Sequence, residues 1–372
     1  MARVSVITIF LLIFISGYSQ ELSTRPITVS DTSRVRIVFA GDMMGHMPVI
    51  DATYNDSTKS YNYTPIFEYI RPYISSADLA VVNLEVTLAG PPFSGYPQFS
   101  SPDALANGLK DDGFNLFITA NNHSLDRGKQ CMERTIKVLD SLQIMHIGTF
   151  KDSVEKSKQY PLFMIKNNII LAFLNYTYGT NGLKVQYPNI VNYIDTAEIR
   201  KDIKICRNQA DFIIVTIHWG TEYQRFPNKE QREIAEFIQK CGANAVIGSH
   251  PHVIQPMERF YNTKDSADYF PIMFSLGNFV SNQRDRYRDG GIIFELNLEK
   301  ITSTKIKSCA YLPVWVYKGI FLGKTVYRLI PPDRFSDAVN TYVLDDKDKQ
   351  KCIEFFNDTR EHLKNMDEVI NR

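Results

Sequence analysis

Short apolar segments that end directly in acidic, amide or imidazole side chains recur along this sequence. Residues 35–40 are rich in β-branched side chains and run straight into Gly41 and Asp42. Such runs are typical of buried strands, and amphipathic stretches at helical spacing lie between them, which predicts an α/β fold. Strands are expected over residues 35–40, 79–84, 116–119, 169–174, 212–217, 245–247, 272–275, 312–317 and 325–329, and helices over 131–142, 198–209, 230–241 and from about 346.

The polar residues that follow these strands are expected to converge on one site. In open α/β sheets, ligands bind at the carboxyl ends of the strands, because the loops there project from a rigid scaffold towards one crevice. Six different segments deliver side chains to that edge. These side chains are Asp42, Glu85, Asn122 with His123, His218, His250 with His252, and Asn278.

The residue types in these segments suit divalent metals. Imidazoles and carboxylates accept Zn, Mn or Fe, and four of the seven histidines fall in the clusters. Two ions about 4 Å apart, sharing a carboxylate, would activate water and an electrophile for hydrolysis. The sequence therefore predicts a hydrolase-type centre with two divalent ions, bound by Asp42, Glu85, Asn122, His218, His250 and His252.

Each of these residues also has a structural interpretation when it is taken alone. Asp42 would serve as a helix N-cap, and a lone histidine such as His218 usually belongs to a core. The pair of His250 and His252 favours metal, because side chains two apart on an extended segment point to the same side. His146 and His362 lie outside any such context and are expected to be structural or solvated.

Composition limits the partners and the organisation of the chain. The net charge of +1 over 372 residues argues against nucleic acid as a partner. Five widely spaced cysteines without a CxxC pattern indicate neither a zinc cage nor a disulfide framework. We expect one catalytic domain over residues 34–330 and a C-terminal helical extension over 331–372.

The N-terminus has the layout of a secretory signal peptide. Arg3 supplies a positive charge, residues 4–15 are apolar, and small residues follow at 16–19. We therefore expect a signal peptide over 1–19 and a polar linker over 20–33, which would place the protein in the periplasm or at the cell surface. The alternative is an uncleaved N-terminal anchor, although the apolar run is shorter than the roughly 20 residues that span a bilayer.

Six segments resemble, in order, the signature segments of CapA-type capsule (poly-γ-glutamate) synthesis proteins, a family of the calcineurin-like metallophosphoesterase superfamily. The resemblance covers roughly residues 35–317 and implies a four-layer αββα sandwich with the metal site between the sheet edges. The segments are Gly41-Asp42-Met43-Met44, Asn83-Leu84-Glu85, residues 120–126, His218-Trp219-Gly220-Thr221-Glu222, residues 248–252 and residues 275–279.

The resemblance also implies roles for individual residues. His123 would act as general acid or transition-state stabiliser, paired with Asp126. Met44 departs from the pattern, which usually has histidine there, and His46 is an alternative ligand. The remaining roles are Asp42 and His252 on the first ion, Glu85 bridging, Asn122, His218 and His250 on the second ion, and Glu222 and Asn278 lining the pocket.

Arginines near the motif loops would bind substrate carboxylates or phosphates, Arg127 among them. The leading hypothesis is an exported, metal-dependent hydrolase that acts on an anionic cell-envelope polymer or a phosphoester during capsule synthesis. Membrane-bound capsule synthesis machinery would then be its partner. One alternative is a non-catalytic accessory that binds and guides a γ-glutamyl polymer during export, and another is a phosphodiesterase or nucleotidase.

Overall fold

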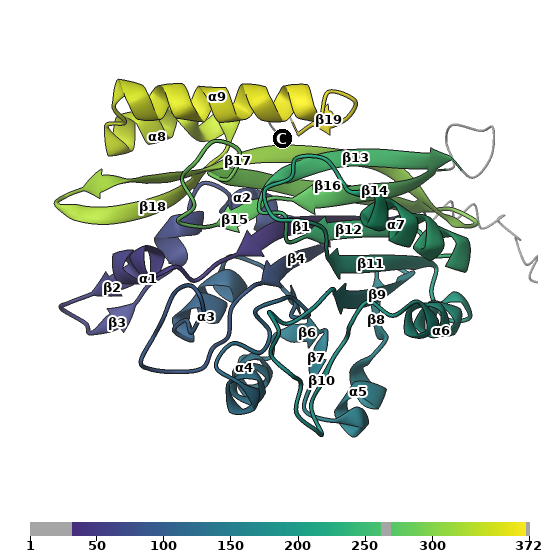
Figure 1. Ribbon diagram of the computed structural model, residues 1–372. Helices are drawn as coiled ribbons and strands as arrows, with labels where there is room; N and C mark the ends of the chain where they lie inside the picture. Colours follow the sequence, from purple (N-terminus) through teal and green to yellow (C-terminus); the bar gives the residue numbers. More distant parts are fainter. Residues whose placement is uncertain (1–31, 262–268, 370–372) are drawn as a thin grey trace, which may run out of the picture. The chain divides into compact units, whose positions relative to one another are not determined.

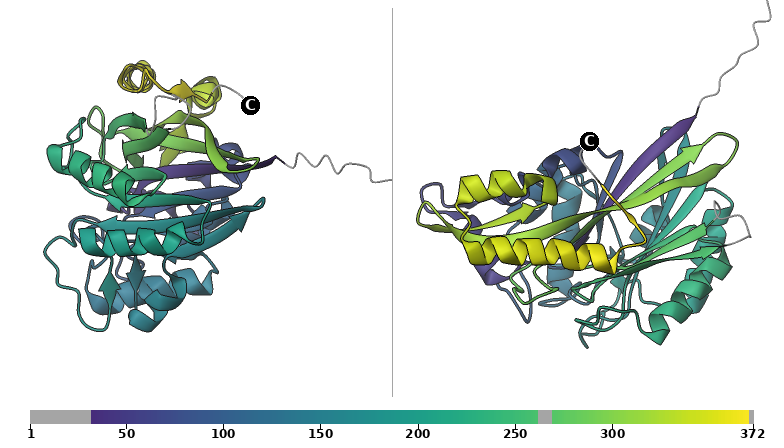
Figure 2. Two further views of the ribbon diagram at one scale, coloured as in Figure 1. Left: turned by 90° about the vertical axis from the view of Figure 1, so that its right-hand side faces the viewer. Right: turned by 90° about the horizontal axis from the view of Figure 1, so that it is seen from above.

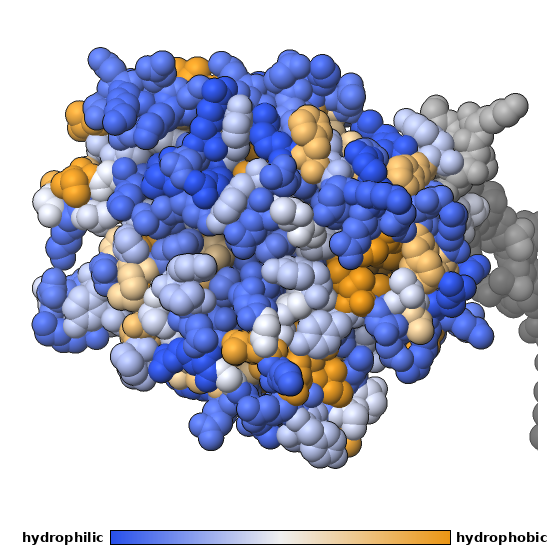
Figure 3. Space-filling model, viewed as in Figure 1, coloured by the Kyte–Doolittle hydropathy of each residue, from blue (hydrophilic) through white to orange (hydrophobic). Residues whose placement is uncertain are grey.

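The computed structural model describes residues 32–261 and 269–369. The expected signal peptide 1–19 and nearly all of the expected linker 20–33 lie outside the described residues. The described part is built on two large β-sheets with helices around them (Figure 1). None of its helices is long and apolar enough to cross a membrane. The face drawn in Figure 3 is largely hydrophilic, with hydrophobic side chains in a few separate areas.

The first large sheet has nine strands in the order β18-β17-β16-β1-β4-β5-β6, with β15 beside β1 and β19 beside β17. Strands β1 (Ser33–Met43), β4 (Leu79–Leu84), β5 (Leu116–Ile118) and β6 (Met145–Ile147) run parallel. The antiparallel half consists of β16 (Gly290–Lys300), β17 (Thr304–Phe321) and β18 (Lys324–Ile330), while β15 (Asn278–Val280) and β19 (Asp367–Glu368) are short additions.

The second sheet has six strands in the order β13-β14-β12-β11-β9-β8. Its centre is parallel and its two outer strands are antiparallel, so the central strands are covered on both faces and consist almost entirely of buried residues. The strands are β8 (Leu162–Lys166), β9 (Ile169–Thr177), β11 (Phe212–His218), β12 (Ala245–Ser249), β13 (Ile254–Tyr261) and β14 (Tyr269–Leu276).

The two sheets pack face to face, with helices on both outer sides. Alternate residues of β1 enter different cores: Phe39 belongs to the core between the sheets, and Val38 to the core under the outer helices. In the right view of Figure 2 the sheets lie between the purple-blue and the teal-green helices, which confirms the predicted αββα sandwich. The helices are α1 (Met47–Thr53), η1 (Thr64–Phe67), α2 (Arg71–Ser75), α3 (Ala104–Asp111) and α4 (Lys129–Ser141) on one side, and α6 (Thr196–Arg207) and α7 (Lys229–Cys241) on the other.

The segment 331–372, predicted to be a helical extension, contains η2 (Pro332–Arg334), α8 (Phe335–Tyr342) and α9 (Asp346–His362). Helix α9 packs over β17 through buried Cys352 and Phe355 (Figure 1). Smaller elements complete the description: β2 (Tyr54–Asn55) with β3 (Ser60–Tyr61), β7 (Thr149–Phe150) with β10 (Ile190–Val191), and α5 (Ser153–Gln159).

Local patterns located nine strands of the two large sheets. They missed β16, as well as β6, β8, β13, β15 and β19. The predicted strand 79–84 coincides with β4, whereas the predicted strand 312–317 is only the middle of the 18-residue strand β17. Strand β16 begins with Gly290 and Gly291, which in a sequence suggest a turn. A Cβ on Gly291 would lie 2.6 Å from the carbonyl oxygen of Leu276, so close packing against the neighbouring chain requires glycine there.

Candidate metal centre

The predicted ligands lie together where parallel strands of the two sheets end. Asp42 is the second-last residue of β1, Glu85 directly follows β4, and His218 is the last residue of β11. His250 directly follows β12. These residues, together with Asn122 and His252, are at most 3% exposed. The two sheets therefore bury acidic, amide and imidazole groups in one place.

Asp42 and His252 form one half of this cluster. Asp42 Oδ2 lies 3.0 Å from His252 Nδ1, and Asp42 Oδ1 accepts a hydrogen bond of 2.8 Å from the Asn83 amide. The preceding residue must be glycine, because a Cβ on Gly41 would lie 2.0 Å from the carbonyl oxygen of Gly277. Close contact between these two chain segments thus sets the position of Asp42.

His218 and Asn122 form the other half. His218 Nε2 lies 2.9 Å from Asn122 Oδ1, and His218 Nδ1 lies 2.9 Å from the hydroxyl of Ser249. The rings of His218 and His250 have centroids 4.8 Å apart. Two imidazoles and an amide oxygen are therefore adjacent.

Glu85 joins the two halves. Its Oε1 lies 3.6 Å from His218 Nε2 and 3.6 Å from His252 Nε2, yet has no hydrogen-bond partner among the described residues. Its Oε2 accepts a hydrogen bond of 3.0 Å from Asn83. A buried carboxylate oxygen without a hydrogen bond is costly, so this atom is placed for a cation.

The spacing of the donor atoms fits a metal centre. With metal–ligand bonds of about 2.1 Å, neighbouring ligand atoms stand roughly 3 to 3.5 Å apart. The distances of 2.9 to 3.6 Å around Glu85 and His218 fall in or near this range. Three groups, each with its ligand atoms within 4.8 Å of one another, occur here: Glu85, His218 and His250; Asp42, Glu85 and His252; and Glu222, His250 and His252.

The electrostatics of the two carboxylates also favour a cation. Burial and the adjacent charge of Asp42 raise the pKa of Glu85 well above its usual value. Burial alone would raise the pKa of Asp42 as well, but the hydrogen bond and the charge of His252 outweigh it and lower that pKa. A divalent ion between them would offset both the burial and the repulsion that raise the pKa of Glu85.

Burial favours the neutral form of the imidazoles of His218 and His250. Burial, followed by the neighbouring His250 and His252, lowers the pKa of His218 well below its usual value. The same causes, burial and then His252, lower the pKa of His250 to about 3 and that of His46 to about 4. A neutral imidazole has a lone pair available for a metal, so His218 and His250 suit this purpose at neutral pH.

The segment with His250 and His252 is not extended, contrary to expectation. Strand β12 ends at Ser249, and His250 and His252 adopt positive φ angles of 100° and 57°. Left-handed backbone costs a non-glycine residue on the order of 1–3 kcal/mol and clusters at functional sites. The two imidazoles reach the same site, with ring centroids 5.9 Å apart, through a strained turn rather than through strand alternation.

His123 lies beside the cluster and is oriented by Asp126. His123 Nδ1 is 2.7 Å from Asp126 Oδ2, which also accepts a hydrogen bond of 2.6 Å from the backbone N–H of Phe99. The ring of Phe99 packs edge-on against His123. A pocket of about 340 Å³ opens here, lined by Tyr96, Pro97, Gln98, Asn122, His123, Asp126, Asn181, Leu183 and Glu222.

The other residues predicted for the site have different positions. Glu222 is exposed at the edge of the cluster. Asn278 donates to the carbonyl oxygens of His252 and Arg288, so its amide joins two loops. Arg127 donates to the carbonyl oxygens of Gly90 and Pro92, and its guanidinium is not part of the pocket lining.

Met44, which stands where the pattern usually has histidine, is buried, and His46, the alternative ligand, is partly buried. His46 Nδ1 accepts the backbone N–H of Asn282 at 3.3 Å, and its ring packs edge-on against Phe99. Met44 belongs to the core under the outer helices. Neither belongs to a group of ligand atoms at metal-binding distance.

Two residues of the site were not predicted. Asn83 donates to both Asp42 and Glu85 and so holds the two carboxylates in place. Tyr178 stacks over His218 at an interplanar angle of 8° and packs 4.6 Å from the His250 ring. Tyr178 directly follows β9, so the rule that found the other residues would have found it if that strand had been extended to Thr177.

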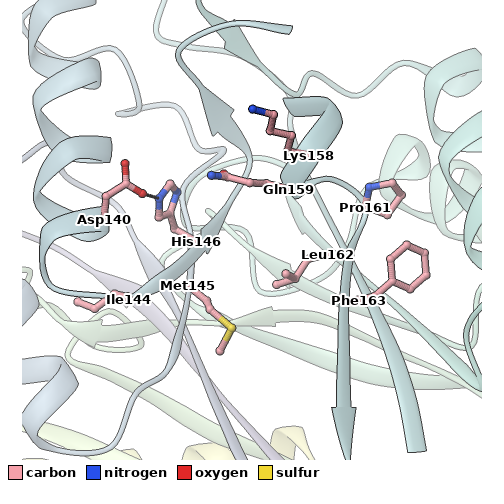
Figure 4. Close-up of a pocket in the computed structure, with 9 residues that line it drawn as sticks. All are labelled: Asp140, Ile144, Met145, His146, Lys158, Gln159, Pro161, Leu162 and Phe163. Carbon is pink, nitrogen blue, oxygen red and sulfur yellow. Dashed lines mark hydrogen bonds and ion pairs between the residues drawn. The ribbon is translucent and has the colours of Figure 1, made fainter. Parts of the chain in front are cut away.

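A second histidine–carboxylate pair lies in a separate hollow of about 410 Å³. Figure 4 shows His146 and Asp140 joined by a hydrogen bond there, in a hollow that Lys158, Gln159 and Phe163 also line. His146, expected to be structural or solvated, is thus a buried neighbour of a partly exposed aspartate. None of the three groups of candidate metal ligands includes this pair.

Comparison with known proteins finds relatives of this chain among capsule synthesis proteins. A family model described as bacterial capsule synthesis protein PGA_cap matches residues 36–283. The PGA biosynthesis protein CapA of Bacillus subtilis (strain 168) is 27% identical over 92% of this chain and 91% of its own length. The capsule biosynthesis protein CapA of Bacillus anthracis is 24% identical over 72% of this chain and 65% of its own.

Among solved structures, a Staphylococcus aureus protein assigned as a 5'-nucleotidase, crystallised with alpha-ketoglutarate, has a similar fold. The TM-score is 0.51 at 13% identity, and the match covers 87% of this chain. This chain spans 58% of the length of that protein. At this identity the likeness shows a common fold of metallophosphoesterase type, and nothing about the substrate.

Proposed function

Since this chain belongs to the bacterial capsule synthesis protein family PGA_cap, we propose that it is a divalent-metal-dependent hydrolase of capsule biosynthesis. Its substrate would be an anionic cell-envelope polymer or a phosphoester. It would act outside the cytoplasm, alongside membrane-bound capsule synthesis machinery. The proposal joins the family to the chemistry that the buried cluster can support.

One observation carries the proposal: Glu85 Oε1 is buried between two sets of imidazoles and has no hydrogen-bond partner among the described residues. Asp42 and His252 would hold one ion, Asn122, His218 and His250 the other, and Glu85 both. Ions in such a centre supply Lewis acidity towards a phosphoryl or carbonyl oxygen and towards water.

His123 is placed to move a proton during the reaction. Asp126 accepts a hydrogen bond from Nδ1, so the ring is oriented and Nε2 is the atom left to give or take a proton. The pocket beside it is lined by the amide side chains of Gln98, Asn122 and Asn181. We infer that His123 protonates the leaving group of a substrate bound in this pocket.

Two arginines at the rim support an anionic substrate. Arg288 lies 4.4 Å over the ring of Tyr223, which in turn lies 6.2 Å from the ring of His252. Arg225 stacks 4.0 Å over the ring of Tyr287. Stacking holds each guanidinium in a defined orientation, which favours recognition of carboxylates or phosphates.

The neighbouring arginines have structural partners instead. Arg284 donates to the backbone carbonyl of Val316, and Arg286 pairs with Asp358 and Glu354 on α9. Arg288 itself pairs with the exposed carboxylate of Asp285. Because the Asp285 side chain is 73% exposed, this pair is weak and leaves Arg288 able to bind another anion. We therefore expect Arg225 and Arg288 to contact substrate.

Metal analysis combined with turnover tests the proposal. The full chain would be stripped with a chelator and reloaded with Mn²⁺, and ions per chain and hydrolysis of bis-p-nitrophenyl phosphate and of γ-glutamyl oligomers would be measured. We expect two ions in the wild type and loss of at least one in His250→Ala, with turnover reduced about 10²-fold or more. His146→Ala, a matched histidine outside the centre, should retain both. A wild type that binds no ion would contradict the proposal.

A second candidate is a non-catalytic protein that binds a γ-glutamyl polymer. The stacked guanidinium groups of Arg225 and Arg288 favour it, because they could bind the carboxylates of a polymer without a metal. Saturable binding of γ-glutamyl oligomers that is lost in Arg288→Ala and unchanged in His250→Ala, without turnover, would support this candidate over the hydrolase.

A further inference from the structure

The loop that follows β11 is hydrogen-bonded to the loop that follows β12. The backbone N–H of Trp219 donates to the carbonyl oxygen of Ser249 at 3.1 Å, and that of Tyr223 donates to Pro251 at 2.7 Å. These bonds continue the parallel pairing of the two strands beyond their ends. Glu222 lies between the two anchored residues, so the backbone brings it alongside the segment that carries the paired imidazoles.

The turn that leads to Glu222 is tightly built. Gly220 has a φ of +87°, and a Cβ there would lie 2.6 Å from the buried carboxamide carbon of Gln231. Gln231 donates a hydrogen bond to the side-chain oxygen of Gln255. Gln255 in turn donates to the carbonyl oxygen of Gln224 at 2.8 Å. Both sides of Glu222 are therefore anchored, although its side chain faces solvent.

The carboxylate of Glu222 is within metal-binding reach of two imidazoles. One of its oxygens and one nitrogen each of His250 and His252 all lie within 4.8 Å of one another. His250 is 3% exposed, and its Nδ1 has no hydrogen-bond partner among the described residues. This unpartnered nitrogen is independent of the carboxylate and also indicates a missing ligand.

The buried half around Asp42 has three carboxylate or imidazole ligands among the described residues, namely Asp42, Glu85 and His252. First-row divalent ions take at least four ligands, so at least one further ligand can bind on this side. Met44 offers a buried thioether in an apolar core, and His46 belongs to none of the ligand groups. Glu222 is the remaining carboxylate that the backbone brings to these imidazoles.

We propose that Glu222, which lies beside His250 and His252, is the solvent-side ligand of one of the divalent ions of this centre. The inference rests on the proposed metal-dependent function and adds a ligand to it. The structure thus favours Glu222 over His46 as the residue that completes the centre. Because its side chain is exposed, Glu222 would be the ligand on the solvent side of an otherwise buried site.

The test compares Glu222→Gln, which keeps the size and removes the charge, with Glu361→Gln, the same change on an exposed residue of α9. Mn²⁺ affinity of the stripped full chain would be measured by titration calorimetry, and ions per chain by elemental analysis. We expect Glu222→Gln to lower the affinity for one of the bound ions about 10- to 100-fold. Glu361→Gln and His46→Ala should bind as the wild type does.

Equal affinity in Glu222→Gln and wild type would overturn the inference, as would a loss of affinity in His46→Ala alone. A wild type that binds no ion would instead overturn the proposed function, so the two failures are distinguishable. Thermal unfolding of the stripped proteins controls for folding: since Glu222 is exposed, its variant should unfold at the same temperature as the wild type.

Discussion

Two histidine–aspartate pairs in this protein are nearly identical in chemistry and differ in their surroundings. His123 Nδ1 lies 2.7 Å from Asp126 in the centre between the sheets, and His146 Nε2 lies 3.1 Å from Asp140 in the hollow of Figure 4. In the first pair both side chains are at most 5% exposed, whereas Asp140 is 43% exposed. The pairs differ in what lies next to them.

The neighbours decide what each pair can do. Asp126 also accepts the backbone N–H of Phe99, and its histidine adjoins the predicted ligand Asn122. Asp140 instead shares its charge with Lys151, and its histidine has no ligand group within reach. A histidine–carboxylate pair is thus a catalytic candidate only where other groups supply an electrophile and a pocket.

The largest expected difference between the pairs is in catalysis. His123→Asn should lower turnover of an alkyl phosphodiester, whose alkoxide leaving group must be protonated, by about 10²- to 10⁴-fold, the usual contribution of a positioned general acid. His146→Asn should leave turnover unchanged, because that side chain lies outside the centre. Steady-state kinetics of the Mn²⁺-loaded variants measures both. Equal losses in the two variants would remove the distinction between the pairs.

The next difference is in stability. Asp126→Asn should lower the free energy of unfolding by about 1–3 kcal/mol, because a neutral amide oxygen accepts the buried Phe99 N–H and His123 N–H less strongly than a carboxylate oxygen does. Asp140→Asn should cost no more than about 1 kcal/mol, since its carboxylate is partly solvated. Urea denaturation at pH 7 provides the measurement, and a larger cost at Asp140 would contradict the comparison.

A smaller effect concerns the coupling within the outer pair. A double-mutant cycle with His146→Ala and Asp140→Ala should give a coupling free energy of about 0.2–1 kcal/mol. The low value follows from exposure of the aspartate and from its second partner Lys151. Coupling of several kcal/mol, determined from four denaturation curves, would show that this pair is buried in solution.

The smallest effect is a dependence on pH. The hydrogen bond from His146 lowers the pKa of Asp140. Burial acts in the opposite direction, and the hydrogen bond from Lys151 lowers the pKa further, to about 2 from 3.8. A lowered carboxyl pKa stabilises the fold above the unfolded value and ceases to do so as the pH falls through the folded value. The advantage of wild type over Asp140→Asn should therefore vanish between about pH 4 and pH 2. A difference in melting temperature that persists at pH 2 would contradict this.

Local signals were sufficient where a segment carries its own pattern. Residues 79–84 are apolar on both faces, and the segment is the buried strand β4. Helix α9 begins at the predicted Asp346, because Asp345 accepts the backbone N–H of Asp348 as an N-cap. Strand β16 could not be predicted, since the need for Gly290 and Gly291 arises from other strands packed against them.

The same division holds for the site. The residue types of the candidate ligands and their positions after strands are local, so Asp42, Glu85 and His218 could be proposed from the chain alone. Two features could not be predicted from the chain alone. Arg127 donates to the backbone carbonyl oxygens of Gly90 and Pro92, and the backbone at His250 has a positive φ angle. They depend on loops whose partners are distant in the sequence.

The sequence by itself determined which side chains follow buried strands and which of them are able to bind a metal, because periodicity and residue chemistry act within a few residues. Only the tertiary structure decided which of them meet. Asp42 and His252 are 210 residues apart and come within 3.0 Å because two separate sheets pack face to face. Pairing over such separations depends on the order of the strands, which no local pattern encodes.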